Sequence, residues 1–97
     1  MRKGGNVADK IGTAVRVEIV DIMGGGKCPS GFEVGRTWLI SDGLCPAGMC
    51  AWAFNAILPF ITTLRFDGRF PWRAEPLARV CCPDADNPVV YQLTAES

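Results

Sequence analysis

The sequence predicts an α+β fold: a small, mostly antiparallel sheet of about four strands on one central kinked helix, in the order β-β-α-β-β. Three observations carry this prediction. Residues 14–22 alternate between apolar and polar side chains, as a half-buried strand does. Residues 43–64 contain no charged side chain and place apolar residues at helical spacing. Short apolar runs bounded by proline, glycine and asparagine lie before and after that stretch, as strands between turns do.

The first strand is expected to have one buried face, formed by alternate residues from Val15 to Asp21. Three glycines, Gly24 to Gly26, end it and open a loop. Residues 33–40 predict a second strand that bends or bulges at Gly35.

The helix is expected to begin near Pro46 or Ala47, because proline fits the first helical turn. Helical spacing predicts a buried stripe of Cys50, Phe54, Ile57, Ile61 and Leu64. Pro59 removes one backbone hydrogen bond and should kink the helix. Gly68 is expected to cap its end, and a hairpin at Asp67-Gly68 is the alternative.

Two further strands are expected at residues 77–82 and 89–93, with a polar turn between them. Neighbouring side chains in a strand point to opposite faces. Cys82 shares the more apolar face with Ala78, whereas Cys81 shares the other face with Arg79. Cys82 is therefore the cysteine expected to point inward.

Length and composition fit one small domain. The chain has 97 residues, 48% of them apolar, which is enough for one modest core. We expect residues 1–12 to form a flexible leader and residues 13–97 to form a single α+β domain. Charged residues balance to a formal net charge of zero, so no basic field favours nucleic acid as a partner.

The uncharged run at residues 43–64 is long enough to raise the question of a membrane span. It contains Pro46, Gly48 and Pro59, and its first part has the composition of a loop, so we expect a buried helix and no membrane contact. The N-terminus is polar, without the apolar core of a signal peptide, and the cysteine number is odd. We therefore expect a cytoplasmic protein with reduced thiols.

The strongest chemical signal is the placement of five cysteines in a chain without histidine. Cys28 lies beside Lys27 in a glycine-rich loop. Cys50 lies in the expected first turn of the helix, on its buried stripe, and Cys82 faces inward from a strand. We expect these three thiols to converge. Three thiolates with an open position are suited to hold a metal ion or an iron–sulfur cluster, and reactive thiols or simple packing are the alternatives.

The absence of histidine limits the catalytic chemistry. It excludes Cys–His and Ser–His–Asp catalysis. Asp42, Asp84 and Glu75 are the candidate bases, and no spacing selects one of them.

Cations and aromatic side chains interleave after the helix, where Arg69 and Trp72 are candidate ligand-binding residues. Lys27, next to Cys28, is a third candidate. The alternative for the arginines is that they lie in solvent and extend over packed aromatic rings.

Three blocks resemble an uncharacterised family of small prokaryotic proteins of similar length. They are GGGKCPSGFEVG, PAGMCAWAFNAILPFITTLRFDGRFPW and VCCPDADNPVVYQL, and the resemblance extends from Val15 to Leu93. It implies that Cys28, Cys50 and Cys82 are the recurring cysteines. Members often have histidine at the position of Asn55, which makes Asn55 a further candidate ligand-binding residue.

Three functions follow as hypotheses. The first is a thiol-cluster protein that binds a metal ion, an iron–sulfur cluster or a small ligand through the three cysteines. The second is a non-catalytic assembly module, because a helix that is apolar nearly all round should also contact another subunit or a protein partner. The third is a histidine-independent enzyme that uses a thiolate or carboxylate in a pocket under Phe70 and Trp72.

Overall fold

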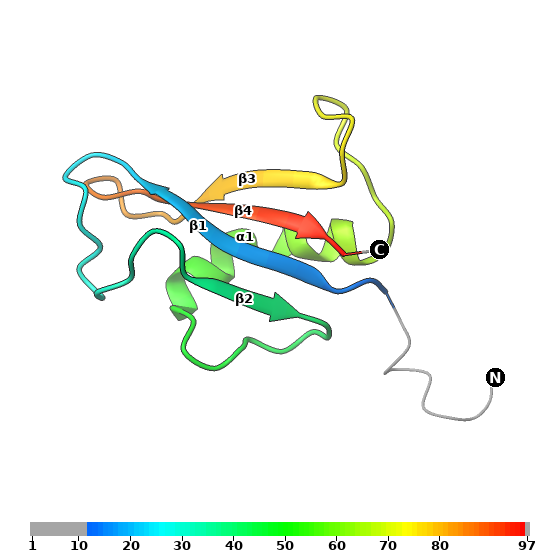
Figure 1. The fold of residues 1–97 in the computed structure, drawn as a ribbon, viewed down its shortest axis with the longest axis horizontal. Coiled ribbons are helices and arrows are strands. Elements are labelled where there is room, and N and C mark those ends of the chain that lie inside the picture. Colours follow the sequence, from blue (N-terminus) through cyan, green and yellow to red (C-terminus); the bar gives the residue numbers. More distant parts are fainter. Residues whose placement is uncertain (1–11, 97) are drawn as a thin grey trace.

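A computed structural model describes residues 12–96 and confirms the α+β fold in the order β-β-α-β-β. The elements are β1 (Val15–Ile22), β2 (Thr37–Ile40), α1 (Ala51–Arg65), β3 (Leu77–Cys81) and β4 (Val89–Ala95). The four strands form one antiparallel sheet in the order β2-β1-β4-β3. Figure 1 shows α1 lying across one face of this sheet. Most of the expected leader, residues 1–11, lies outside the described residues.

A bulge in β1 changes which side chains of that strand face the helix. Val15, Val17 and Ile19 are fully buried, as expected, and pair with alternate residues of β4. The register then shifts between Ile19 and Asp21. The prediction that Asp21 shares the buried face is therefore wrong: it is exposed, and Ile22 is half-buried against the core.

The second strand is shorter than expected, because its predicted first half forms a turn. Gly35 has a φ of 98°, a left-handed conformation that interrupts an extended strand. The amide of Gly35 still donates to the Ile19 carbonyl at 2.8 Å, and Ile19 donates to the Arg36 carbonyl at 2.9 Å. Trp38 and Ile40 then point inward from β2.

The helix begins later than the sequence suggested. Gly48 has a φ of 77°, and a turn closes there through a bond from the Met49 amide to the Pro46 carbonyl. Cys50 is consequently the N-cap of α1, with an extended backbone, rather than a residue of its first turn.

The helix end has the expected kind of cap, shifted by one residue. Asp67, rather than Gly68, adopts the left-handed conformation, with a φ of 64°. The amide of Gly68 bonds to the Thr63 carbonyl at 2.8 Å, and the amide of Asp67 bonds to the Leu64 carbonyl at 3.3 Å. This pair of bonds forms a Schellman motif, which stops the helix before the chain turns toward β3.

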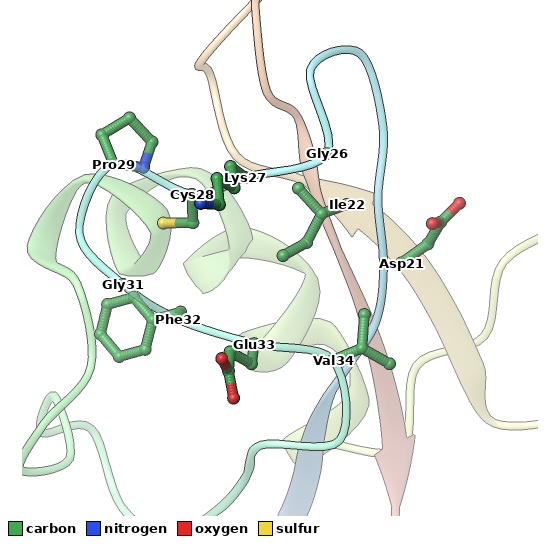
Figure 2. Close-up of a pocket in the computed structure, with 10 residues that line it drawn as sticks. All are labelled: Asp21, Ile22, Gly26, Lys27, Cys28, Pro29, Gly31, Phe32, Glu33 and Val34. Carbon is green, nitrogen blue, oxygen red and sulfur yellow. The ribbon is translucent and has the colours of Figure 1, made fainter.

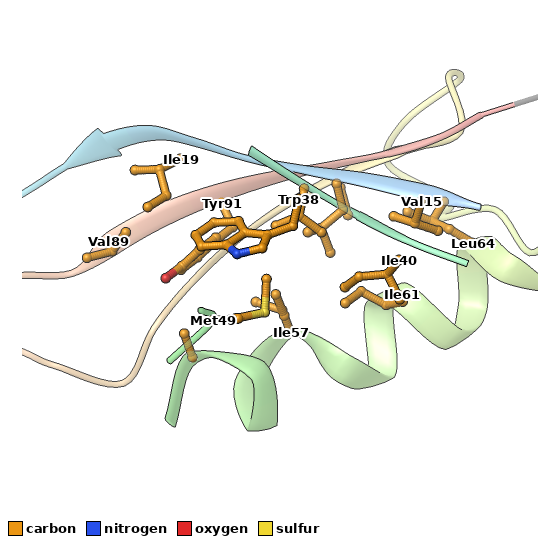
Figure 3. Close-up of a cluster of buried hydrophobic side chains, with 14 of the residues drawn as sticks. Val15, Ile19, Trp38, Ile40, Met49, Ile57, Ile61, Leu64, Val89 and Tyr91 are labelled. Carbon is orange, nitrogen blue, oxygen red and sulfur yellow. The ribbon is translucent and has the colours of Figure 1, made fainter. Parts of the chain in front are cut away.

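The core lies between α1 and the sheet (Figure 3). From the helix it takes Ala53, Ile57, Ile61 and Leu64. Three of these belong to the expected stripe; Phe54 and Cys50 are only half-buried at its edge. From the sheet it takes a larger set with alternating inward positions: Val15, Val17, Ile19, Trp38, Ile40, Ala78, Val89, Tyr91 and Leu93.

Candidate functional site

Three cysteines from three distant segments line one small pocket, here called the thiol pocket. Cys28 comes from the loop after β1, Cys50 is the N-cap of α1, and Cys82 directly follows β3. All three are half-buried free thiols. The three cysteines that the sequence indicated thus line the same pocket. The complete lining is Cys28, Pro29, Ser30, Phe32, Cys50, Trp52, Ala53, Cys82, Asp84, Asn87, Val89 and Tyr91.

The other two cysteines lie outside this pocket. Cys45 is exposed in the loop before α1, and its thiol bonds to the carbonyl of Pro46 at 3.7 Å. Cys81 is exposed on the face of β3 that α1 does not cover. Cys82 lies one residue beyond the end of β3, which is one residue shorter than expected, and it lines the pocket that Cys81 does not line.

Backbone contacts position each site cysteine. The Cys28 carbonyl accepts the amide of Gly31 at 2.9 Å, which closes a turn. The Cys50 carbonyl accepts the first bond of the helix, from the amide of Phe54 at 2.9 Å. Cys82 is held by a reciprocal pair of contacts: its amide donates to the Val89 carbonyl at 3.0 Å, and its sulfur accepts the Val89 amide at 3.4 Å.

The size of the thiol pocket restricts what it could hold. Its volume is about 70 Å³. Pockets for drug-sized ligands have volumes of roughly 300–1,000 Å³. The thiol pocket thus suits a single ion or a group of a few atoms.

Tyr91 forms the floor of the thiol pocket and is 1% exposed. Figure 3 shows its ring among the core side chains, with the hydroxyl at the outer end of the ring. Burial raises the pKa of Tyr91, and negative charge on Cys82, Cys50 and Cys28 acts in the same direction. All three thiols are thus close enough to act electrostatically on one hydroxyl.

An alkaline titration should report on this environment without ambiguity, because Tyr91 is the only tyrosine in the chain. Its pKa is raised in the folded protein above an unfolded value of about 10. Above that pH the unfolded chain binds fewer protons than the folded one, so stability is full below about pH 10 and falls as pH rises.

We therefore expect tyrosinate absorbance to rise only together with loss of the circular dichroism of the fold. Tyr91→Phe supplies the baseline, because it lacks the phenol hydroxyl and keeps every other side chain of the protein. A tyrosinate signal that develops near pH 10 with the fold intact would contradict the expectation.

An aromatic cluster braces the wall of the thiol pocket. The Phe32 and Trp38 rings meet edge to face at 5.8 Å, and the Trp38 and Tyr91 rings lie 6.3 Å apart. The Arg36 guanidinium lies over both Phe32 and Trp38, at 5.4 and 4.8 Å from the ring centroids. This cation–π contact holds Phe32 at the pocket edge.

A second and larger pocket lies beside the first and is here called the outer pocket. Figure 2 shows the loop after β1 encircling it. Its volume is about 650 Å³, and its lining consists of Asp21, Ile22, Gly26, Lys27, Cys28, Pro29, Gly31, Phe32, Glu33 and Val34. Cys28, Pro29 and Phe32 belong to both pockets.

The loop between β3 and β4 contributes two polar side chains, of which the sequence had indicated Asp84 as a candidate base but not Asn87. Asp84 and Asn87 line the thiol pocket. One oxygen of Asp84 accepts the amides of Asp86 and Asn87 at 3.0 and 3.3 Å, so the carboxylate organises its own turn. Of the three candidate bases, Asp84 is the one in the thiol pocket lining.

The four candidate ligand-binding residues are scattered. Lys27 lines the outer pocket, next to Cys28. Asn55 is exposed on α1, and Arg69 is exposed with its guanidinium bonded to the Gly68 carbonyl at 2.8 Å. Trp72 is 70% exposed and stacks on Phe70 at 5.3 Å. Neither pocket described above is lined by Asn55, Arg69 or Trp72.

The sequence raised two questions that the described residues bear on: whether side chains are grouped to hold a metal ion, and whether a helix could cross a membrane. Among residues 12–96, no group of three or more histidine, cysteine, aspartate or glutamate side chains is arranged to hold a metal ion. The same residues include no helix with the length and apolarity to cross a membrane.

Comparisons with family models, with curated proteins and with solved structures found no match for this chain.

The N-cap position of Cys50 decides the expected effect of a serine substitution. A serine buried within the helix would leave an unpartnered hydroxyl and destabilise the fold. At the N-cap, where no side chain now bonds to the helix, a serine hydroxyl can accept a free backbone amide of the first turn. We expect Cys50→Ser to raise the free energy of unfolding by about 1 kcal/mol relative to Cys50→Ala. Urea denaturation measures the difference, and equal stability of the two variants would contradict it.

Proposed function

We propose that this protein is a thiol-site protein, in which Cys28, Cys50 and Cys82 together bind or react with a small soft electrophile. The observation that carries the proposal is the shared pocket: three free, half-buried thiols from three segments line it. Thiolates are soft nucleophiles and soft ligands. A cytoplasmic location, where thiols stay reduced, fits this chemistry.

The pocket volume favours a small occupant over a large one. A cavity of about 70 Å³ has room for one ion or a few atoms. An iron–sulfur cluster is commonly held by four cysteines, and this pocket has three. A single soft metal ion is the alternative occupant, which would require the thiols to close around it on binding.

The resemblance to the family of small prokaryotic proteins supports the same three positions. We propose membership of that family on the order of the cysteine blocks. Cys45 and Cys81 fall outside its recurring positions, and they also lie outside the thiol pocket.

Arsenite is the sharpest probe of convergent thiols, because one arsenic(III) atom bonds to three sulfurs and releases three water molecules. Protein purified without oxygen should bind one equivalent. Bound arsenite should protect Cys28, Cys50 and Cys82 from iodoacetamide, as read by peptide mass spectrometry, while Cys45 and Cys81 stay reactive. The same sample should be assayed for metal content and for an absorption spectrum.

Two variants make the arsenite result decisive. A chain with Cys45→Ser and Cys81→Ser should keep full arsenite binding, because both residues lie outside the thiol pocket. Cys28→Ser should lose the third bond and most of the affinity. Equal alkylation of all five thiols, with or without arsenite, would overturn the proposal.

A second candidate function is assembly of two copies through α1. The specific observation is that its outward side lacks charge from Ala51 to Leu64 and exposes Trp52, which is 56% accessible. The formal net charge of zero gives little repulsion between copies. Light scattering should then show a dimer that Trp52→Glu dissociates. A monomer at high concentration would overturn this candidate.

A further inference from the structure

We propose that Cys28 is the entry thiol of the site, and that the outer pocket binds a small zwitterionic disulfide whose sulfur reaches Cys28. This inference rests on the proposed function and assigns it a substrate class and an order of events. It would make the protein a thiol–disulfide exchange module for low-molecular-weight disulfides.

The relation between the two pockets is the first argument. The outer pocket, at about 650 Å³, has the volume of a small-molecule site, whereas the thiol pocket has about 70 Å³. Cys28 lines both, while Cys50 and Cys82 line only the smaller one. A ligand too large to enter the thiol pocket can therefore contact Cys28 from the outer pocket. Cys50 and Cys82 line only the smaller pocket.

The lining of the outer pocket indicates the class of ligand. It combines one cation, Lys27, with two carboxylates, Asp21 and Glu33. These charges complement a molecule that carries both carboxylate and ammonium groups. Ile22, Phe32 and Val34 add apolar surface beside them (Figure 2). A disulfide of an amino-acid-like thiol has this combination of charges around a short apolar centre.

The position of Cys28 in the outer pocket suits it to attack first, because it is the one thiol of the three that this pocket reaches. Its thiolate is the nucleophile in disulfide exchange. Phe32, braced by the Arg36 guanidinium at 5.4 Å, forms a wall common to both pockets. The ligand body would thus be kept on the outer side of this ring.

The exchange balances in two steps, with the small disulfide as oxidant. The Cys28 thiolate attacks one sulfur of the ligand, the ligand S–S bond breaks, and one small thiolate leaves with its electron pair. The thiolate of Cys50 or Cys82 then attacks the Cys28 sulfur, forms an internal disulfide and releases the second small thiolate. The protein loses two electrons and two protons, and the ligand gains both.

The test compares cystine, which is zwitterionic, with the neutral 2-hydroxyethyl disulfide on the full chain. Exposed Cys45 is an internal reference in the same molecule. For each cysteine, the rate of mixed-disulfide formation with cystine is divided by its rate with the neutral disulfide. We expect this ratio to be roughly fivefold higher at Cys28 than at Cys45, which is the gain that one exposed ion pair supplies. Lys27→Gln should lower that ratio toward the Cys45 value.

A trapping variant tests the order of events. In a chain that already carries Cys45→Ser and Cys81→Ser, which removes the two exposed free thiols, the further pair Cys50→Ser and Cys82→Ser should leave a stable mixed disulfide on Cys28 and release one cysteine per chain. The same background with Cys50 and Cys82 intact should release two. If that variant fails to fold, each single variant should still give the mixed disulfide first at Cys28.

The two levels of the proposal fail separately. Arsenite protection of the three thiols combined with equal rate ratios at Cys28 and Cys45 would overturn the assignment of the outer pocket and leave the thiol site standing. Loss of arsenite protection would overturn the thiol site itself.

Discussion

Leu93→Ala is expected to lower the free energy of unfolding by about 3 kcal/mol, within the usual range for leucine truncation in a core. Leu93 is completely buried in β4, the strand with neighbours on both sides, where it pairs with Val17 and Ala78. Truncation removes its transfer free energy and leaves a cavity that a sheet held on both sides closes poorly. A domain of this size has only about 5–15 kcal/mol of stability in total.

Leu39→Ala is the matched control, because it has the same chemistry in another strand of the sheet. Leu39 lies in the edge strand β2 and is 53% exposed on the face away from α1. Its truncation should cost less than about 0.5 kcal/mol. Urea denaturation of both variants measures the difference, and comparable costs would mean that the core is not where the structure places it.

The fold was predictable because alternation and helical spacing report directly on burial. Alternation from Val15 to Ile19 identifies the inward face of β1, and all three of its expected members there are buried. It fails at Asp21, since a bulge shifts the register by one residue and no residue type marks that shift.

The helix start was misjudged because two signals compete before Cys50. Pro46 favours a first helical turn, while Gly48 permits the left-handed conformation that prevents one. In the structure Gly48 adopts the left-handed conformation, and the helix begins only at Ala51. The later start affects the candidate site, because it makes Cys50 the N-cap of α1 rather than a residue of its first turn.

The candidate site was only partly predictable. Helical spacing placed Cys50 on the buried side of the helix, and strand alternation directed Cys82 inward. Cys28 was selected by its place in the glycine-rich loop. All three line the thiol pocket. Alternation from Val89 would also have marked Tyr91 as inward. The part played by Asp84 and Asn87 depends on how the 82–88 loop folds against the glycine loop, and no local pattern encodes such a contact between distant segments.

Gly24→Ala is expected to be the second strongly destabilising change, because it disrupts that contact between the loops. Gly24 has a φ of 61°, and a Cβ there would lie 2.2 Å from the Asp86 carbonyl oxygen, a backbone atom that cannot rotate away. The neighbouring bonds from Met23 to the Pro88 carbonyl and from Gly25 to the Asp86 carbonyl, both 2.9 Å, hold the two loops at this distance. We expect a loss of about 3 kcal/mol, from left-handed strain of about 1 kcal/mol together with separation of the loops.

Gly26→Ala separates these two causes. Gly26 has a similar φ of 77°, but nothing lies within 4 Å of the position that a Cβ would occupy there. Its alanine variant should therefore show the left-handed strain alone, about 1 kcal/mol. Gly24→Ala should in addition loosen the loop that carries Asp84 and Asn87, and so weaken arsenite protection of Cys82, while Gly26→Ala should leave that protection intact. Equal stability losses in the two variants would show that the approach of the glycine loop to Asp86 contributes nothing to the fold.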